Sequence, residues 1–165
     1  MEGASFSLIV KDVHNGETVF AYDTLRQLTP ASVMKTVTTA TALEILGEDY
    51  RFPTTLAYDG SIEKGLLKGN LYIKGSGDPS LGSAHFAPYH KRFLQEWISA
   101  LKKVGIHKIQ GAVIADESIF DTEGTSFKWV GEDMGSYYGA GSYGLCVFDN
   151  LYNRTATGLP EAARS

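Results

Sequence analysis

One stretch decides how this chain folds: Thr29-Pro30-Ala31-Ser32-Val33-Met34-Lys35, followed by an apolar run to Gly47. Thr29 is typical of a helix N-cap, and Pro30 suits the first helical position, where its missing N–H costs nothing. From Val33 onward the apolar residues recur at helical spacing. We therefore expect a largely buried helix from about residue 30 to residue 46, which Gly47 ends in a left-handed conformation.

The same stretch places a serine and a lysine three residues apart, at Ser32 and Lys35. Residues three apart are neighbours on one helix face, so we expect the hydroxyl and the amine to lie within hydrogen-bond reach. A serine becomes a nucleophile when a neighbouring base takes its proton, and a neutral lysine can be that base. Burial and the positive end of the helix dipole both favour the neutral amine. The pattern therefore predicts a nucleophile–base pair, with the Ser32 N–H available to an oxyanion.

Spacing alone is weak evidence, because S-x-x-K also occurs at Ser61–Lys64 and Ser99–Lys102. The first of these two lies in a glycine-flanked turn, and the second lies on the polar side of an amphipathic helix. Only Ser32 follows a capping residue and opens an apolar helix. The alternative is that Ser32 merely supplements the cap and that Lys35 is a solvated first-turn residue.

The composition excludes several classes of protein. The chain has 165 residues, 43% of them hydrophobic and 21% charged, which is typical of a globular protein. Its net charge of −4 gives no reason to expect a nucleic-acid partner, and no apolar run reaches the length of a membrane span. The first residues carry no basic or apolar region of a secretory signal peptide.

Cysteine and histidine give no sign of a metal or a disulfide. The single cysteine, Cys146, excludes an internal disulfide framework, and its apolar surroundings predict burial. The four histidines show no metal-ligand spacing, so we expect neither a metal nor a cofactor.

The rest of the chain alternates between strand-like and helix-like patterns. Asn15-Gly16 is a strong hairpin signal between two strands. Asp78 is expected to bond its own backbone in a tight turn. The expected strands are 5–13, 18–22, 50–58, 66–74, 111–115 and 143–149, with a helix at 90–104 and a loose tail at 154–165. The long loop before the last strand ends in a tyrosine-rich stretch, 136–143, which is either functional or a cover for a core edge.

Taken in order, several segments resemble the low-molecular-weight class C penicillin-binding proteins, the D-alanyl-D-alanine carboxypeptidase/endopeptidase family. The resemblance extends over nearly everything up to Asn153. It rests on the hairpin Phe6–Tyr22, the helix start Leu28–Lys35, the loop Gly69–Leu81, the strand Gly111–Phe120, Tyr138-Gly139-Ala140 and Asp149-Asn150.

The resemblance implies an α/β (α+β) fold. Residues 1–58 would be the N-terminal part of a penicillin-binding transpeptidase-like (serine β-lactamase-like) domain, and 59–153 part of a smaller inserted α/β domain. It also implies a serine-type peptidase that acts on peptidoglycan stem peptides through an acyl-enzyme on Ser32, with Lys35 as base. β-Lactam antibiotics would acylate Ser32, and the location would be periplasmic or extracytoplasmic.

The sequence departs from the family in two motifs. Such enzymes also use an S-x-N element and a K-T-G-type strand, and neither occurs in this chain. We therefore expect an N-terminal portion of a longer enzyme that is inactive alone. Carboxypeptidase and endopeptidase activity both stay open. The alternative from another class is a non-catalytic cell-wall binding or interaction module in which Ser32 only caps a helix.

Overall fold

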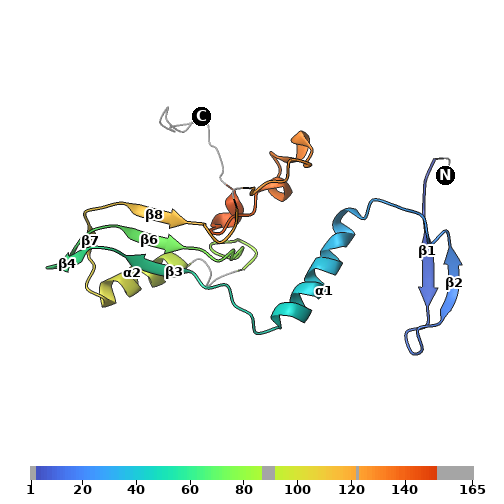
Figure 1. The fold of residues 1–165 in the computed structure, drawn as a ribbon, viewed down its shortest axis with the longest axis horizontal. Coiled ribbons are helices and arrows are strands. Elements are labelled where there is room, and N and C mark those ends of the chain that lie inside the picture. The colour runs from blue at the N-terminus through green and yellow to red at the C-terminus, as the bar shows by residue number, and fades with distance from the viewer. Residues whose placement is uncertain (1–2, 87–91, 122, 152–165) are drawn as a thin grey trace. The chain divides into compact units, whose positions relative to one another are not determined.

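The computed structural model describes residues 3–86, 92–121 and 123–151. The chain divides into two compact units, Met1–Tyr50 and Arg51–Ser165, and each is described by itself (Figure 1). The predicted loose tail at 154–165 lies outside the described residues, and the domain boundaries at 58/59 and 153/154 stay predictions. Among the described helices, none combines the length and apolar character that crossing a membrane requires.

Unit 1 begins with the predicted hairpin. Strands β1 (Leu8–Lys11) and β2 (Thr18–Tyr22) pair antiparallel. The turn between them depends on Asn15 and Gly16. The Asn15 side-chain oxygen accepts the N–H of Glu17 at 2.8 Å, and Gly16 adopts a φ of 75°, which glycine reaches without strain. The hairpin predicted from Asn15-Gly16 is therefore confirmed.

The helix of unit 1 starts differently from the prediction. A 3₁₀ turn spans Ala31–Val33, and helix α1 runs through Met34–Leu46. Pro30, not Thr29, takes the cap position, and no side chain makes a capping hydrogen bond, so the predicted Thr29 cap is wrong. Gly47 does end the helix, but its φ of 81° and ψ of 164° are not left-handed helical.

The predicted burial of this helix is also wrong for residues 3–50. No residue of α1 is buried, and the apolar side chains of the hairpin are exposed as well. Val37 is 59% exposed in the helix, and Phe20 is 52% exposed in β2. The apolar residues of α1 are spread around the helix and are not gathered on one face, so several elements would be needed to cover them, whereas residues 3–50 offer only one two-stranded hairpin.

Unit 2 contains two three-stranded sheets whose order is β3-β6-β8 and β4-β5-β7. Each sheet joins one antiparallel pair (β3 with β6, β4 with β5) to one parallel pair (β6 with β8, β5 with β7). Figure 1 shows β6 between β3 and β8. The strands are β3 (Thr55–Tyr58), β4 (Ser61–Glu63), β5 (Leu66–Lys68), β6 (Leu71–Lys74), β7 (Lys108–Ile109) and β8 (Val113–Asp116).

The two sheets are halves of one bent sheet, because β3 leads into β4, β5 into β6 and β7 into β8, with one strand of each pair in each half. We call the line along which the sheet bends, at Asp59, Gly69 and Asn70, the crease. The predicted strand 66–74 is thus two strands, β5 and β6, with Gly69 and Asn70 at the crease. A side chain on Gly69 would clash with the backbone of Asp59. Asn70 holds the three segments together: its N–H donates to Asp59 Oδ1 at 2.6 Å, and its Oδ1 accepts the N–H of Ala112 at 3.0 Å.

Helix α2 (Phe93–Lys103) lies within the predicted 90–104. The predicted strand 50–58 begins only at Thr55, and the predicted strand 111–115 is β8. The core of unit 2 comes from the sheet, the helix and their connections. Its buried apolar residues are Leu67, Leu71, Leu81, Phe93 and Ile106. This combination of two helices with antiparallel and parallel strands confirms the expected mixed α+β class.

The region after β8 contains short 3₁₀ turns instead of a final strand. The predicted strand 143–149 is wrong: only a bridge between Asp78 and Leu145 forms there. The backbone φ is 53° at Phe148 and 58° at Asp149, values that no strand residue adopts. The predicted turn at Asp78 is confirmed, because its Oδ1 accepts the backbone N–H of Ser80 at 2.8 Å.

Candidate functional site

Ser32 and Lys35 contact one another at the start of α1. The Lys35 Nζ donates a hydrogen bond to the Ser32 Oγ at 3.1 Å. Ser32 lies in the 3₁₀ turn, and Lys35 lies in the first turn of the α-helix, so one helical turn of spacing brings the two groups together. The predicted hydrogen-bond distance is confirmed, and the catalytic role of the pair stays a prediction.

The backbone just before Ser32 is strained. Ala31 has a φ of 45°, in the left-handed region that residues other than glycine rarely adopt. Such a conformation costs on the order of 1–3 kcal/mol and is often found at functional sites. The N–H of Ser32 belongs to the first turn, where a helix leaves its donors without intrahelical partners. An N–H in this place is suited to stabilise negative charge on a nearby oxygen.

The other two S-x-x-K motifs do not form such a pair in the described part of the chain. The Ser99 Oγ donates to the carbonyl oxygen of Gln95 at 2.7 Å, inside its own helix. Ser61 begins strand β4, and its motif lysine lies beyond the end of that strand. Only Ser32 accepts a hydrogen bond from the lysine of its own motif, which is the distinction that sequence spacing could not make.

One of the two conditions expected to favour a neutral Lys35 is missing here. Both Ser32 and Lys35 are exposed, so the described residues do not desolvate the amine. The Nζ–Oγ distance of 3.1 Å is within hydrogen-bond reach. Proton transfer from the Ser32 hydroxyl requires that the amine accept in this contact.

A polar cluster that sequence reasoning missed lies at the crease of the sheet. Asp59 accepts hydrogen bonds from the N–H and side-chain amide of Asn70 and from the Tyr72 hydroxyl at 2.8 Å. These bonds, chiefly that of the Asn70 N–H, lower the pKa of Asp59 below its usual value. The hydrogen bond to Asp59 raises the pKa of Tyr72. The cluster ties the segments of the crease together, and its donors and acceptors are satisfied by one another.

Two further side chains make local hydrogen bonds. Asp116 accepts the N–H of Ser118 at 3.0 Å, and its hydrogen bonds with Ser118 lower its pKa. Cys146 is partly rather than fully buried, with its thiol donating to the Tyr143 carbonyl at 3.2 Å. Among the described residues, no three His, Cys, Asp or Glu side chains are grouped to hold a metal ion.

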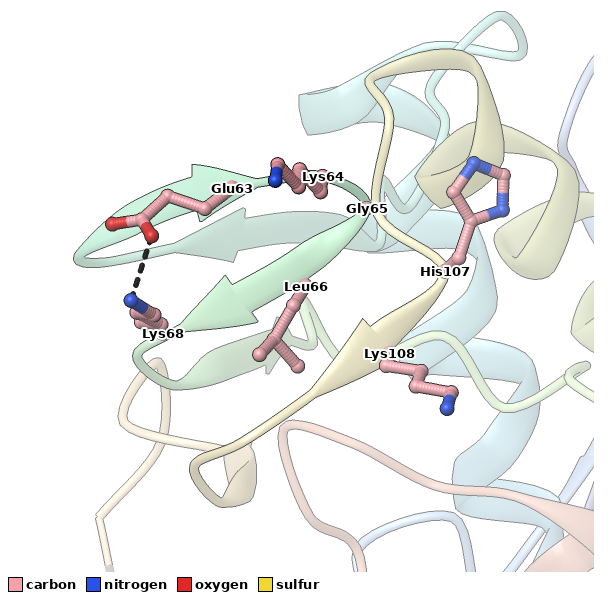
Figure 2. A pocket seen from close by; sticks show the side chains of 7 residues that line it. All are labelled: Glu63, Lys64, Gly65, Leu66, Lys68, His107 and Lys108. Carbon is pink, nitrogen blue, oxygen red and sulfur yellow. Dashed lines mark hydrogen bonds and ion pairs between the residues drawn. The ribbon is translucent and has the colours of Figure 1, made fainter.

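A hollow in unit 2 also escaped the sequence analysis. It has a volume of about 730 Å³ and lies at the turn between β4 and β5 and beside β7 (Figure 2). Lysines predominate in its lining, which is Glu63, Lys64, Gly65, Leu66, Lys68, His107 and Lys108. Its lining comes from two segments far apart in the sequence, 63–68 and 107–108, and the pairing of β5 with β7 that joins them could not be read from the sequence.

Comparisons with known proteins agree with the resemblance. Residues 1–162 match the family described as D-Ala-D-Ala carboxypeptidase 3 (S13). The D-alanyl-D-alanine carboxypeptidase of Actinomadura sp. (strain R39) is 32% identical over 163 residues, which are 99% of this chain and 28% of the relative. D-alanyl-D-alanine carboxypeptidase DacB of Haemophilus influenzae is 29% identical over 133 residues, which are 81% of this chain and 26% of the relative.

A solved structure shows the same fold. The crystal structure of penicillin binding protein 4 (dacB) from Haemophilus influenzae superposes with a TM-score of 0.73 at 28% identity, over 86% of this chain and 30% of that one. The complex of that protein with a β-lactam gives a TM-score of 0.59 at 32% identity, over 70% and 25%. This chain therefore spans between a quarter and a third of the length of its relatives, and it belongs to the D-Ala-D-Ala carboxypeptidase 3 (S13) family.

Proposed function

We propose that this chain carries the nucleophile and the general base of a serine-type D-Ala-D-Ala carboxypeptidase acting on peptidoglycan stem peptides. The observation that carries the proposal is the 3.1 Å hydrogen bond between Lys35 Nζ and Ser32 Oγ at a helix start. The family membership supports the reaction class, because the two relatives compared above are named as D-alanyl-D-alanine carboxypeptidases.

In the proposed reaction, Ser32 Oγ attacks the carbonyl carbon between two D-alanines while neutral Lys35 takes the hydroxyl proton. The carbonyl oxygen becomes an oxyanion near the Ser32 N–H. The C–N bond then breaks, and the departing D-alanine amine takes up a proton. An ester remains between Ser32 and the shortened peptide, and water hydrolyses it to restore the hydroxyl.

We also propose that β-lactams acylate Ser32, since a related penicillin binding protein has been solved in complex with one. The β-lactam ring would open at the same carbonyl-attack step and leave an ester on Ser32. An extracytoplasmic location follows from a peptidoglycan substrate. The proposed arrangement is a transpeptidase-like segment over residues 1–58 and part of an inserted domain over 59–153.

The chain by itself is proposed to have no useful turnover. It contains neither an S-x-N nor a K-T-G element, which supply further donors and the carboxylate-binding strand in enzymes of this kind. Removal of a single oxyanion donor typically costs ~100- to 1,000-fold in rate.

The test is β-lactam labelling of a form of the protein that also contains S-x-N and K-T-G elements. Mass spectrometry of digested protein should place the adduct on the peptide that holds Ser32. Ser61→Ala and Ser99→Ala are matched controls that should label normally, whereas Ser32→Ala should not label. Lys35→Ala should slow labelling by roughly 100-fold or more, as expected for a general base. An adduct on any other peptide defeats the assignment.

The exposure of both Ser32 and Lys35 favours a second candidate, a non-catalytic cell-wall binding module. In that case Ser32→Ala would change helix stability but not the reaction with β-lactams. Labelling rate and thermal stability, measured on the same Ser32→Ala protein, separate the two functions.

A further inference from the structure

The hollow in unit 2 lies on the outward face of the sheet half β4-β5-β7. Strand register places Glu63 opposite Leu66, and Leu66 opposite Lys108. Residues paired in this way share one face, and Lys68 joins that face because it is two residues after Leu66. The other face carries Ile62, Leu67 and Ile109, of which Leu67 is 0% exposed. The sheet therefore turns its apolar face to the core and leaves a charged face around Leu66.

The charges of this face do not cancel. Lys68 Nζ lies 2.6 Å from Glu63 Oε2, which neutralises both groups (Figure 2). Lys64 and Lys108 make no ion pair or side-chain hydrogen bond with any described residue. Lys64 and Lys108 thus line one hollow whose only carboxylate among the described residues, Glu63, is already paired with Lys68, in a chain whose net charge is −4. An unmatched local charge of this kind attracts ligands of the opposite sign.

The wall formed by His107 is fixed in place by the turn. Gly65 has a φ of 85°, and a side chain there would meet the His107 ring at 3.0 Å. The Gly65 carbonyl oxygen accepts the backbone N–H groups of His107 and Lys108 at 2.8 and 3.0 Å. A smaller hollow of about 200 Å³ beside α2 shares these two residues and adds Lys102, and the rest of its lining is aliphatic. His107 and Lys108 therefore lie between a charged hollow and a mainly apolar one.

We propose that this pocket, lined by Lys64, Leu66, His107 and Lys108, binds the free carboxylates of a peptidoglycan peptide stem. This proposal rests on the proposed function, which supplies peptides that end in D-alanine. Such a terminus combines a carboxylate with methyl groups, and the pocket combines unpaired ammonium groups with the partly exposed Leu66. The pocket would hold wall peptide while Ser32, in the other unit, carries out the chemistry.

The shape and lining favour a peptide over other anions. A membrane surface is bound by apolar side chains that insert into it, whereas Leu66 lines a hollow. Single-stranded nucleic acids are bound by aromatic side chains on which bases stack, and the pocket lining contains no Phe, Tyr or Trp. Lysines act as point charges, so they accept a carboxylate without the geometry that an arginine fork would impose.

The test measures co-sedimentation of the full chain with purified insoluble peptidoglycan. The test variant is Lys64→Gln with Lys108→Gln. The matched control is Lys11→Gln with Lys128→Gln, which removes the same charge outside the pocket lining. We expect the test variant to raise the Kd about three- to tenfold in low salt, because each exposed ion pair contributes modestly. The control should change the Kd less than about twofold. Peptidoglycan whose carboxylates have been amidated should bind the wild-type chain as weakly as the test variant binds untreated peptidoglycan.

If both double variants weakened binding to peptidoglycan equally, the effect would be one of net charge alone and the proposal would be overturned. Undiminished binding to amidated peptidoglycan, or no binding of the wild-type chain to peptidoglycan, would also overturn it. Binding to phosphatidylglycerol vesicles but not to peptidoglycan, with the same dependence on Lys64 and Lys108, would overturn it in favour of a lipid surface. β-Lactam labelling tests Ser32, and sedimentation tests Lys64 and Lys108. A failed β-lactam assignment and a failed pocket are therefore distinguished by separate measurements.

Discussion

Replacing Leu67 by alanine tests the placement of the core in unit 2. Leu67 is 0% exposed on the inner face of β5, between Ile62 and Ile109 of the neighbouring strands. The change removes three carbons, worth roughly 2.4 kcal/mol at ~0.8 kcal/mol each. The cavity left behind raises the total to about 3–4 kcal/mol. Leu66→Ala is the matched control, because the neighbouring side chain points to the outer face and is partly exposed.

The free energies of unfolding can be measured by urea titration with tryptophan fluorescence. Both tryptophans, Trp97 and Trp129, belong to unit 2, so this signal reports on that unit. Leu66→Ala should lower the unfolding free energy by no more than about 1 kcal/mol, since little burial is lost. Equal losses from Leu66→Ala and Leu67→Ala would refute the assignment of inner and outer faces, and with it the outward position of the lysine pocket.

Three further outcomes are expected. Gly75→Ala should destabilise unit 2 by about 1–3 kcal/mol in the same titration, because the new methyl group would meet the backbone of Gly144, which cannot rotate away. The pKa of Asp59 is lower in the folded protein than its ordinary value of 3.8, so the Asp59 carboxylate stabilises the fold fully above pH 3.8 and loses this effect as the pH falls through the folded pKa. The difference in urea midpoint between wild type and Asp59→Asn should therefore become smaller in acid. The isolated chain should release no D-alanine from D-alanyl-D-alanine peptides above the buffer rate, and turnover that disappears in Ser32→Ala would contradict this.

Local sequence predicted the features that depend on residues close in the chain. The approach of Lys35 to Ser32 follows from one turn of helix, and the hairpin follows from the turn at Asn15. The Asp78 turn is local as well, since its carboxylate bonds a residue two positions on. In each case, the partner lies within a few residues, so the backbone geometry of one turn or one helix decides the contact.

The features that sequence reasoning missed depend on distant partners. The crease at Gly69 exists because the Asp59 backbone approaches it from another strand, and no periodicity in 66–74 reports that approach. The lysine pocket needs the parallel pairing of Leu66 with Lys108, far along the chain. The exposure of α1 was missed for the opposite reason: its apolar pattern indicated burial, and residues 3–50 provide too little surface to cover it.

The crease has a consequence for how unit 2 folds. Both parallel pairs, β5 with β7 and β6 with β8, are closed by the same connection between β6 and β7, which includes α2. Loop closure is an entropic barrier that depends on chain length and slows the formation of non-local pairs. Once β5 has paired with β7, the short connections from β5 to β6 and from β7 to β8 hold the first residues of β6 and β8 close together. The second parallel pair then forms without the entropic cost of closing another long loop. Refolding followed by tryptophan fluorescence should therefore show one kinetic phase for both halves of the sheet.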